Sequence, residues 1–201
     1  MLQHLRPAIV MMVFFTLLVG LAYPLAMTGV AGLAFPVQAG GSLVRDDNGT
    51  VIGSSLLAQA FAKPQYLHPR PSAAGAGYDP MNSGGSNLGP MDKKLIDRVK
   101  GDAATIAKET GAKDTGGASI PADAVTTSGS GLDPDVSPAN ARLQADRIAQ
   151  NRGVATAEIL AVIDAHQEGA LLGFIGQPRV NVLAVNRALD ASYPVAHSSP
   201  K

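Results

Sequence analysis

The chain has 201 residues, of which 16 are basic and 16 are acidic, so its formal net charge at pH 7 is zero. Such a balance lacks the basic surface typical of nucleic-acid binding, and we therefore expect no nucleic-acid partner. The sequence contains no cysteine, which excludes disulfides, thiolate metal sites and cysteine nucleophiles. Its 22 glycines and 14 prolines indicate many turns, and its few aromatic residues, four Tyr and five Phe, favour a core of Ala, Val, Leu and Ile.

The most distinctive stretch lies near the N-terminus, where no charged side chain occurs between Arg6 and Arg45. Residues 8–27 read AIVMMVFFTLLVGLAYPLAM, in which the only polar groups are one threonine hydroxyl and one tyrosine hydroxyl. A bilayer core of about 30 Å requires about 20 helical residues. We therefore predict a transmembrane helix over residues 8–28.

The charges around this helix predict its orientation. Arg6 precedes the span and no charge follows it closely, so the positive-inside rule places residues 1–7 in the cytoplasm. Residues 29–201 then form one extracytoplasmic, periplasmic domain. A cleaved signal peptide ending near Ala39 is the alternative, but signal-peptide cores are about 7–15 residues long, which favours a retained anchor.

The first elements beyond the span are a predicted hairpin and a short helix. Residues 42–52 contain two β-prone runs on either side of Asn48-Gly49. Asn-Gly is typical of tight hairpins because both residues tolerate positive φ. A short helix capped by Ser54 or Ser55 is expected next, through Phe61.

Residues 64–90 show no periodicity and are rich in Gly, Pro, Ser and Asn, which indicates a long loop. Loops of this length are usually either functional or disordered. Tyr66, Leu67, Tyr78 and Met81 provide apolar groups to bury, which favours an ordered loop that recognises a partner. The candidate recognition residues are Arg70, Pro71, Ser72, Tyr78, Asp79, Ser83, Gly84, Gly85, Ser86, Asn87, Leu88, Gly89 and Pro90.

Helical periodicity returns at Met91, where an apolar face formed by Met91, Leu95, Val99 and Ile106 predicts a helix that ends at Gly111. A connector rich in turn-forming residues follows. Residues 125–127 are predicted to form a short strand.

The second half of the chain has clear helix boundaries. Ser137 is a predicted N-cap, with Pro138 at the first helical position and Gly153 at the end, and Ala141, Ala145 and Ile148 share the inner face. Thr156 is predicted to cap the next helix, which would turn Ile159, Leu160 and Ile163 inward. Residues 171–175 are predicted to form a strand, and Asn181 to cap a final helix ending before Pro194. Short strands and several helices together predict an α+β domain.

General catalytic motifs are absent from the sequence. There is no phosphate-binding G-x-x-x-x-G-K-[ST] loop, and Gly75-Ala76-Gly77 does not continue into G-x-G-x-x-G. The four histidines have no paired spacing that would suggest a metal site. A Ser-His-Asp arrangement assembled from distant loops stays open, but we expect no catalytic residue and no metal.

Three strings are far more specific: RPSAAGAGYDPMNSGGSNLGP at 70–90, VTTSGSGLDPDVSPANARLQADRIAQNRG at 125–153 and GQPRVNVLAVNRALD at 176–190. With the N-terminal span, they make the chain resemble the C-subunit family of the Kdp-type potassium-transporting P-type ATPases over nearly its whole length. Asp135 and Gln177 depart from residues common in that family.

The resemblance implies a non-hydrolysing accessory subunit in the cell inner membrane. Its partners would be a channel-like potassium-binding subunit and an ATP-hydrolysing subunit, and its role would be assembly and stability of the complex. It also implies a catalytic chaperone that raises the ATP affinity of the hydrolysing subunit, with no tightly bound cofactor and with ATP met only transiently. The residues implied to contact nucleotide are Ser128, Gly129, Ser130, Gly131 and Gln144.

The predicted topology places these residues outside the cell, away from cytosolic ATP, and favours coupling through the membrane helix. Ser128–Gly131 is also interpretable as a turn that leads into the next helix. Two other functions remain open from the residues: an exported binding or scaffold domain without a role in transport, and a membrane-anchored hydrolase.

Overall fold

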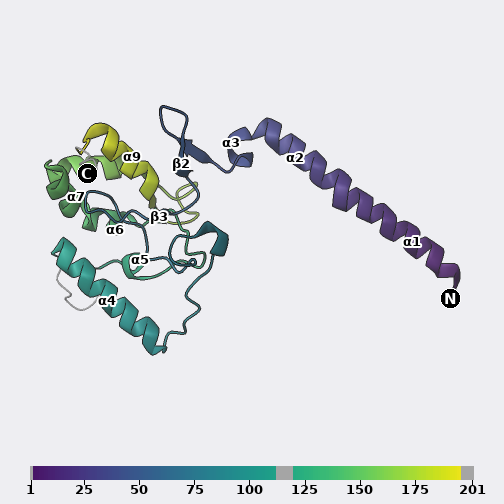
Figure 1. The fold of residues 1–201 in the computed structure, drawn as a ribbon, viewed down its shortest axis with the longest axis horizontal. Coiled ribbons are helices and arrows are strands. Elements are labelled where there is room, and N and C mark those ends of the chain that lie inside the picture. The colour runs from purple at the N-terminus through teal and green to yellow at the C-terminus, as the bar shows by residue number, and fades with distance from the viewer. Residues whose placement is uncertain (1, 112–119, 196–201) are drawn as a thin grey trace, which may run out of the picture. The chain divides into compact units, whose positions relative to one another are not determined.

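The computed structural model describes residues 2–111 and 120–195 (Figure 1). The chain divides into two compact units, Met1–Ser54 and Ser55–Lys201, and each is described here by itself. Together they contain both helices and strands, which confirms the predicted mixture of the two.

The first unit begins with one long helical run, drawn in purple in Figure 1. It consists of α1 (Leu2–Leu17), a π-helical turn (Leu18–Ala22) and α2 (Tyr23–Ala34). The π turn ends just before Pro24. Proline has no amide hydrogen and its ring clashes with the carbonyl four residues earlier, and a wider π turn relieves that conflict without ending the helix.

By length and composition, Gln3–Ala34 is able to cross a membrane. This helix contains the predicted span and extends beyond it at both ends. The short helix α3 (Pro36–Ala39) follows it.

The predicted hairpin is confirmed as β1 (Leu43–Arg45) paired with β2 (Val51–Ser54). The carboxylate of Asp46 accepts hydrogen bonds from the amides of Asn48 (3.0 Å) and Thr50 (2.7 Å), which closes the turn. Gly49 adopts a φ of 81°, as the Asn-Gly pair predicted.

The second unit contains a small antiparallel sheet of order β3-β5-β4, formed by Asp135–Val136, Arg179–Asn181 and Gln167–Glu168 respectively. Its core joins side chains of four helices, two strands and an irregular segment, among them Leu67, Ile148, Ile159, Val180 and Leu189. The elements are the 3-10 turn Pro80–Asn82, α4 (Lys93–Thr110), α5 (Ala122–Val125), β3 (Asp135–Val136), α6 (Pro138–Leu143), α7 (Ala145–Arg152), α8 (Thr156–Ala165), β4 (Gln167–Glu168), β5 (Arg179–Asn181) and α9 (Val182–Ser192).

Most predicted helix ends are confirmed by capping geometry. The Ser137 hydroxyl accepts from the Asn140 amide at 3.1 Å, and the Asn181 side chain accepts from the Ala184 amide at 3.0 Å. Gly153 closes α7 with a φ of 69°. These contacts join neighbours in sequence, which is why local residue types were sufficient to predict them.

Three predicted elements are wrong. Residues 55–61 form no helix; instead the Ala58 amide donates to the Leu132 carbonyl at 2.9 Å. Val125 is the last residue of α5, so residues 125–127 are not a strand. Residues 171–175 form a tight turn with a single antiparallel bridge, because Gly173 allows the chain to reverse in the middle of an apolar run.

Smaller corrections concern helix bounds. α4 begins after Asp92, whose carboxylate accepts from the Lys94 amide at 2.8 Å, so Met91 lies outside the helix. The helix expected to run from Pro138 to Gly153 is interrupted at Gln144. Ala155, and not Thr156, is the N-cap of α8.

Candidate functional site

Residues 64–68, which we call the clamped segment, are held by side chains of distant helices. The Asn186 carboxamide of α9 accepts from the Leu67 amide at 2.7 Å and donates to the Leu67 carbonyl at 2.9 Å. The Gln144 carboxamide does the same for His68, at 2.8 Å and 3.2 Å. Leu67 and His68 therefore lie outside any strand, yet their amides and carbonyls are hydrogen-bonded as they would be beside a neighbouring strand.

Two arginines of α7 complete the clamp. Arg147 donates to the Pro64 carbonyl, and Arg152 donates through Nε to the Gln65 carbonyl at 2.9 Å. Arg152 also lies over the Tyr66 ring, at 5.2 Å from its centroid, in a cation–π contact. Guanidinium groups suit this role because they present several donors in a rigid plane.

Gln144 is the centre of a polar network that connects these contacts. Its Nε2 donates to the Asn140 side chain at 3.0 Å, and its Oε1 accepts from Arg147 at 2.6 Å. Arg147 is only 6% exposed, and burial lowers the pKa of its guanidinium below its ordinary value. All three side chains are buried, so removing one would leave the others with fewer hydrogen bonds in a place that water does not reach.

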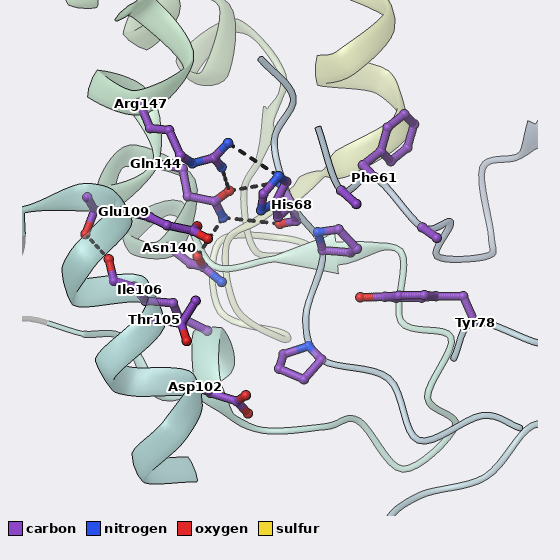
Figure 2. Close-up of a pocket in the computed structure, with 16 residues that line it drawn as sticks. Phe61, His68, Tyr78, Asp102, Thr105, Ile106, Glu109, Asn140, Gln144 and Arg147 are labelled. Atoms are coloured by element: carbon purple, nitrogen blue, oxygen red, sulfur yellow. Dashed lines mark hydrogen bonds between the residues drawn. The ribbon is translucent and has the colours of Figure 1, made fainter. Parts of the chain in front are cut away.

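The network forms one side of a cavity of about 350 Å³. Figure 2 shows Asn140, Gln144 and Arg147 projecting toward His68, with Phe61 and Tyr78 on the other side. Burial, and then the nearby Arg147 charge, hold the pKa of His68 below its ordinary value. The lining residues are Ala60, Phe61, Ala62, His68, Pro69, Pro71, Tyr78, Asp102, Thr105, Ile106, Glu109, Thr110, Ala124, Asn140, Gln144 and Arg147.

The predicted recognition loop packs against the Ser-Gly segment at 128–131. The Ser72 hydroxyl donates to the Gly131 carbonyl at 2.7 Å, and the Gly84 amide donates to the Ser130 carbonyl at 2.9 Å. Gly131 has a φ of 67°, and a Cβ there would lie 2.6 Å from the Ala74 nitrogen. The sequence strings at 70–90 and 125–153 thus pack against each other.

Arg70 anchors the same contact. Its guanidinium forms an ion pair with Asp133 at 2.8 Å and reaches the Thr126 carbonyl at 3.4 Å. Its carbonyl accepts from the Tyr78 hydroxyl at 2.8 Å, and burial raises the pKa of Tyr78. The Asp79 carboxylate accepts from the Asn82 side chain at 2.6 Å, which with backbone hydrogen bonds lowers the pKa of Asp79.

The rest of the loop is more open. The Ser83 hydroxyl donates to the Ser130 carbonyl at 3.0 Å, and a Cβ on Gly85 would lie 3.2 Å from the Gly129 carbonyl oxygen. Asn87 is exposed with a φ of 52°, in the left-handed region that asparagine tolerates. Ser86 and Leu88 are half-buried, and Gly89 and Pro90 are exposed. Met81 is 88% exposed, so the expectation that it would be buried is wrong.

The residues implied to contact nucleotide fall in two places. Gln144 lines the cavity, whereas Ser128, Gly129, Ser130 and Gly131 are not among its lining residues. The N-terminus of α6 faces the carboxylate of Asp123, which accepts from the Ser137 amide at 2.7 Å and the Asn140 side chain at 3.0 Å. A protein anion therefore already lies where a helix N-terminus would attract a phosphate. Nucleotide contact stays a prediction.

The sequence interpretation missed Asn140, Arg147 and Asn186. Each lies on the inner face of its helix, next to apolar positions such as Ala141 and Val185. A polar residue in register with an apolar stripe is the signal that could have identified them, since buried polar groups need partners. Within the described ranges, 2–111 and 120–195, no cluster of three or more His, Asp or Glu side chains could hold a metal.

Comparison with known proteins identifies the family. Residues 5–191 match the KdpC family, described as K+-transporting ATPase, c chain. The chain is 66% identical over 194 residues to a potassium-transporting ATPase KdpC subunit of Caulobacter sp. strain K31, covering 96% of each chain. A Beijerinckia indica protein with the same description is 54% identical, covering 97% of each chain. The chain belongs to the KdpC family.

Proposed function

We propose that this chain is a non-hydrolysing accessory subunit of a high-affinity, ATP-driven potassium uptake complex, needed for assembly and stability. The match of residues 5–191 to the family carries this proposal. Its partners are a channel-like potassium-binding subunit and an ATP-hydrolysing subunit. We assign it no catalytic residue and no tightly bound cofactor. The buried side chains of Asn140, Gln144 and Asn186 form hydrogen bonds within the chain, which fits a structural role.

Deletion and co-purification test this function. A strain lacking the chain should lose growth and potassium uptake at low external potassium, and the full-length chain should restore both. Affinity-tagged chain should retain the two partner subunits through purification in mild detergent. Normal uptake by the deletion strain, together with purification of the chain alone, would contradict the proposal and favour an exported binding domain.

We further propose that Gln3–Ala34 anchors the chain in the cell inner membrane. Leu17→Lys places a charge in the middle of this helix, at a cost of about 2.5–3.5 kcal/mol on insertion scales. Leu33→Lys, near the end of the helix, is the matched control because a lysine there can extend its amine to the interface. Membrane fractionation should show Leu17→Lys lost from the membrane and Leu33→Lys retained. Equal retention of both would argue against a spanning helix.

The orientation we propose places the N-terminus in the cytoplasm and the second unit in the periplasm. Since the sequence has no cysteine, Met91→Cys introduces one thiol at a position that is 88% exposed. A membrane-impermeant maleimide should label it in intact spheroplasts, and should label Gln3→Cys only after lysis. The reverse pattern would overturn the orientation.

We also propose a finer role, in which the chain raises the ATP affinity of the hydrolysing subunit. It would do so through assembly of the complex and through its membrane helix. The contacts of Gly131 and Gln144 within the domain support this route. The KM for ATP should rise when the chain is absent, but should not change with Ser128→Ala, whose hydroxyl faces Ser130 at 3.3 Å. A raised KM in an intact Ser128→Ala complex would instead indicate nucleotide contact.

A further inference from the structure

Residues 35–54, which we call the membrane-proximal segment, contain α3 and the hairpin and are joined to the long helix by hydrogen bonds. The Ser42 amide closes α3 by donating to the Val37 carbonyl at 2.9 Å. The Ser54 hydroxyl donates to the Gly41 carbonyl at 2.8 Å, which ties the end of the hairpin back to the end of α3. The long helix, α3 and the hairpin form one compact unit, so no free linker separates them.

The membrane-proximal segment has no hydrophobic core of its own. Of residues 3–54, whose exposure the structure describes, only Ser54 is buried. The large apolar side chains of the segment are exposed instead, Phe35 by 59%, Val37 by 64% and Leu43 by 45%. An isolated two-stranded hairpin is only marginally stable in water, so an apolar environment around the segment would stabilise it.

Charged and apolar side chains are separated along the segment. No charged residue occurs from Pro7 to Val44, and the first charges, Arg45, Asp46 and Asp47, lie at or next to the hairpin turn. By contrast, α3 and the start of β1, which are nearest to the helix in sequence, are uncharged. The segment thus has an apolar base beside the helix and a charged tip, a distribution that suits a boundary between lipid and water.

The length of the helix places this base at the lipid headgroups. Gln3–Ala34 contains 32 residues, which at 1.5 Å each extend over about 48 Å. A bilayer is about 40–45 Å thick including its headgroups, and a spanning helix is tilted by about 20° on average. The end of the helix therefore emerges at the level of the headgroups, and α3 begins two residues later.

We propose that α3 and the base of the hairpin lie in the lipid interface, with the Phe35 and Val37 side chains at the boundary between headgroups and acyl chains. This rests on the membrane anchor proposed above, to which it adds a second contact that fixes how deeply the helix sits. Lipid is the occupant that the structure favours, because the segment is continuous with the spanning helix and is held to it without a free linker.

A small apolar contact is sufficient for this role. The spanning helix already holds the segment at the membrane, so the contact forms at a high effective concentration and needs little affinity of its own. The hydrogen bonds of α3 and the hairpin are made within the unit, so insertion requires little further ordering.

Tryptophan fluorescence tests the proposal, because the sequence contains no tryptophan of its own. Phe35→Trp and Val37→Trp report on the base of the segment, and Phe15→Trp reports on the middle of the spanning helix. Asp47→Trp, at the exposed hairpin turn, is the matched control. Each full-length chain is reconstituted into phosphatidylcholine vesicles with and without bromine on the acyl chains, since bromine quenches tryptophan fluorescence on close approach.

The emission of Phe35→Trp and Val37→Trp should shift to shorter wavelength and lose most of its intensity in brominated vesicles. Asp47→Trp should keep the emission of tryptophan in water. If positions 35 and 37 match Asp47→Trp while Phe15→Trp is quenched, the inference is overturned and the anchor stands. If Phe15→Trp is not quenched, the anchor itself fails, and the inference fails with it.

Two further outcomes would also overturn the inference. Equal quenching of Asp47→Trp would show that tryptophan itself, and not the segment, draws the chain to the lipid. In vesicles that contain the purified complex, quenching of Phe35→Trp and Val37→Trp should persist. Its loss there would show that a protein surface covers the segment in place of lipid.

Discussion

Two irregular segments of the second unit carry large apolar side chains and place them in opposite surroundings. In the clamped segment, Leu67 is fully buried and its backbone is bonded by the side chain of Asn186. In the turn at residues 171–175, Leu172 is exposed and the backbone bonds are made within residues 170–175.

The difference shows that the source of the backbone hydrogen bonds decides where an irregular segment can lie. A segment without strand partners can enter a core only if side chains from elsewhere satisfy its amides and carbonyls. Asn186 and Gln144 supply these partners to Leu67 and His68. A turn that satisfies itself needs no such support, and its side chains are free to meet another molecule.

The largest effect is expected when Leu67→Ala is compared with Leu172→Ala. The same truncation should lower the free energy of unfolding by about 4 kcal/mol at position 67, where a cavity would form, and by less than about 0.5 kcal/mol at position 172. Urea unfolding of the full-length chain in mild detergent, followed by circular dichroism, measures both. Equal losses would show that the two segments do not differ in the way described.

Removal of the clamp itself should have the next largest effect. Asn186→Ala leaves the amide and the carbonyl of Leu67 buried without partners, which should cost about 3 kcal/mol. Asn151→Ala is the control, because that side chain belongs to an exposed residue and donates to the Arg147 carbonyl of its own helix. The same urea titration distinguishes them, and a loss for Asn151→Ala as large as that for Asn186→Ala would argue against the clamp.

The part of the fold that the sequence predicted consists of local contacts. The Asn48-Gly49 turn, the Ser137 cap and the Gly153 helix end each depend on residues within a few positions of one another. The clamp was not predicted, because Asn186 and Leu67 are 119 residues apart. No local pattern shows that the one will bond the other.

The elements that were predicted wrongly also depend on features that a local pattern does not show. The apolar run at 171–175 has strand-like composition, but it reverses at Gly173. The stretch after Ser54 was expected to form a helix, but the Ala58 amide bonds to Leu132. The sequence correctly marked residues 64–90 as irregular chain that buries Leu67, but it was wrong about Met81 and could not show that Ser72 would contact Gly131.

A pair of glycine variants extends the comparison to the Ser-Gly segment. Gly131 is packed against Ala74 and has a positive φ, so Gly131→Ala should cost about 2 kcal/mol. Gly129 is open, with nothing within 4 Å of an added Cβ, so Gly129→Ala should change the stability by less than about 0.5 kcal/mol. If both variants fold normally but both impair the complex, the segment acts through a surface contact and not through packing.

The smallest expected effect is a pH dependence of the clamped segment. Burial and Arg147 lower the pKa of His68 in the folded chain from its ordinary value of 6.5. The unfolded chain therefore takes up a proton at His68 before the folded chain does, and stability should decline as the pH falls below 6.5. His68→Gln removes this titration, so the urea midpoint of the variant should vary less between pH 7.5 and pH 5.5 than that of the unmodified chain. A midpoint equally sensitive to pH in both proteins would place the titrating group elsewhere.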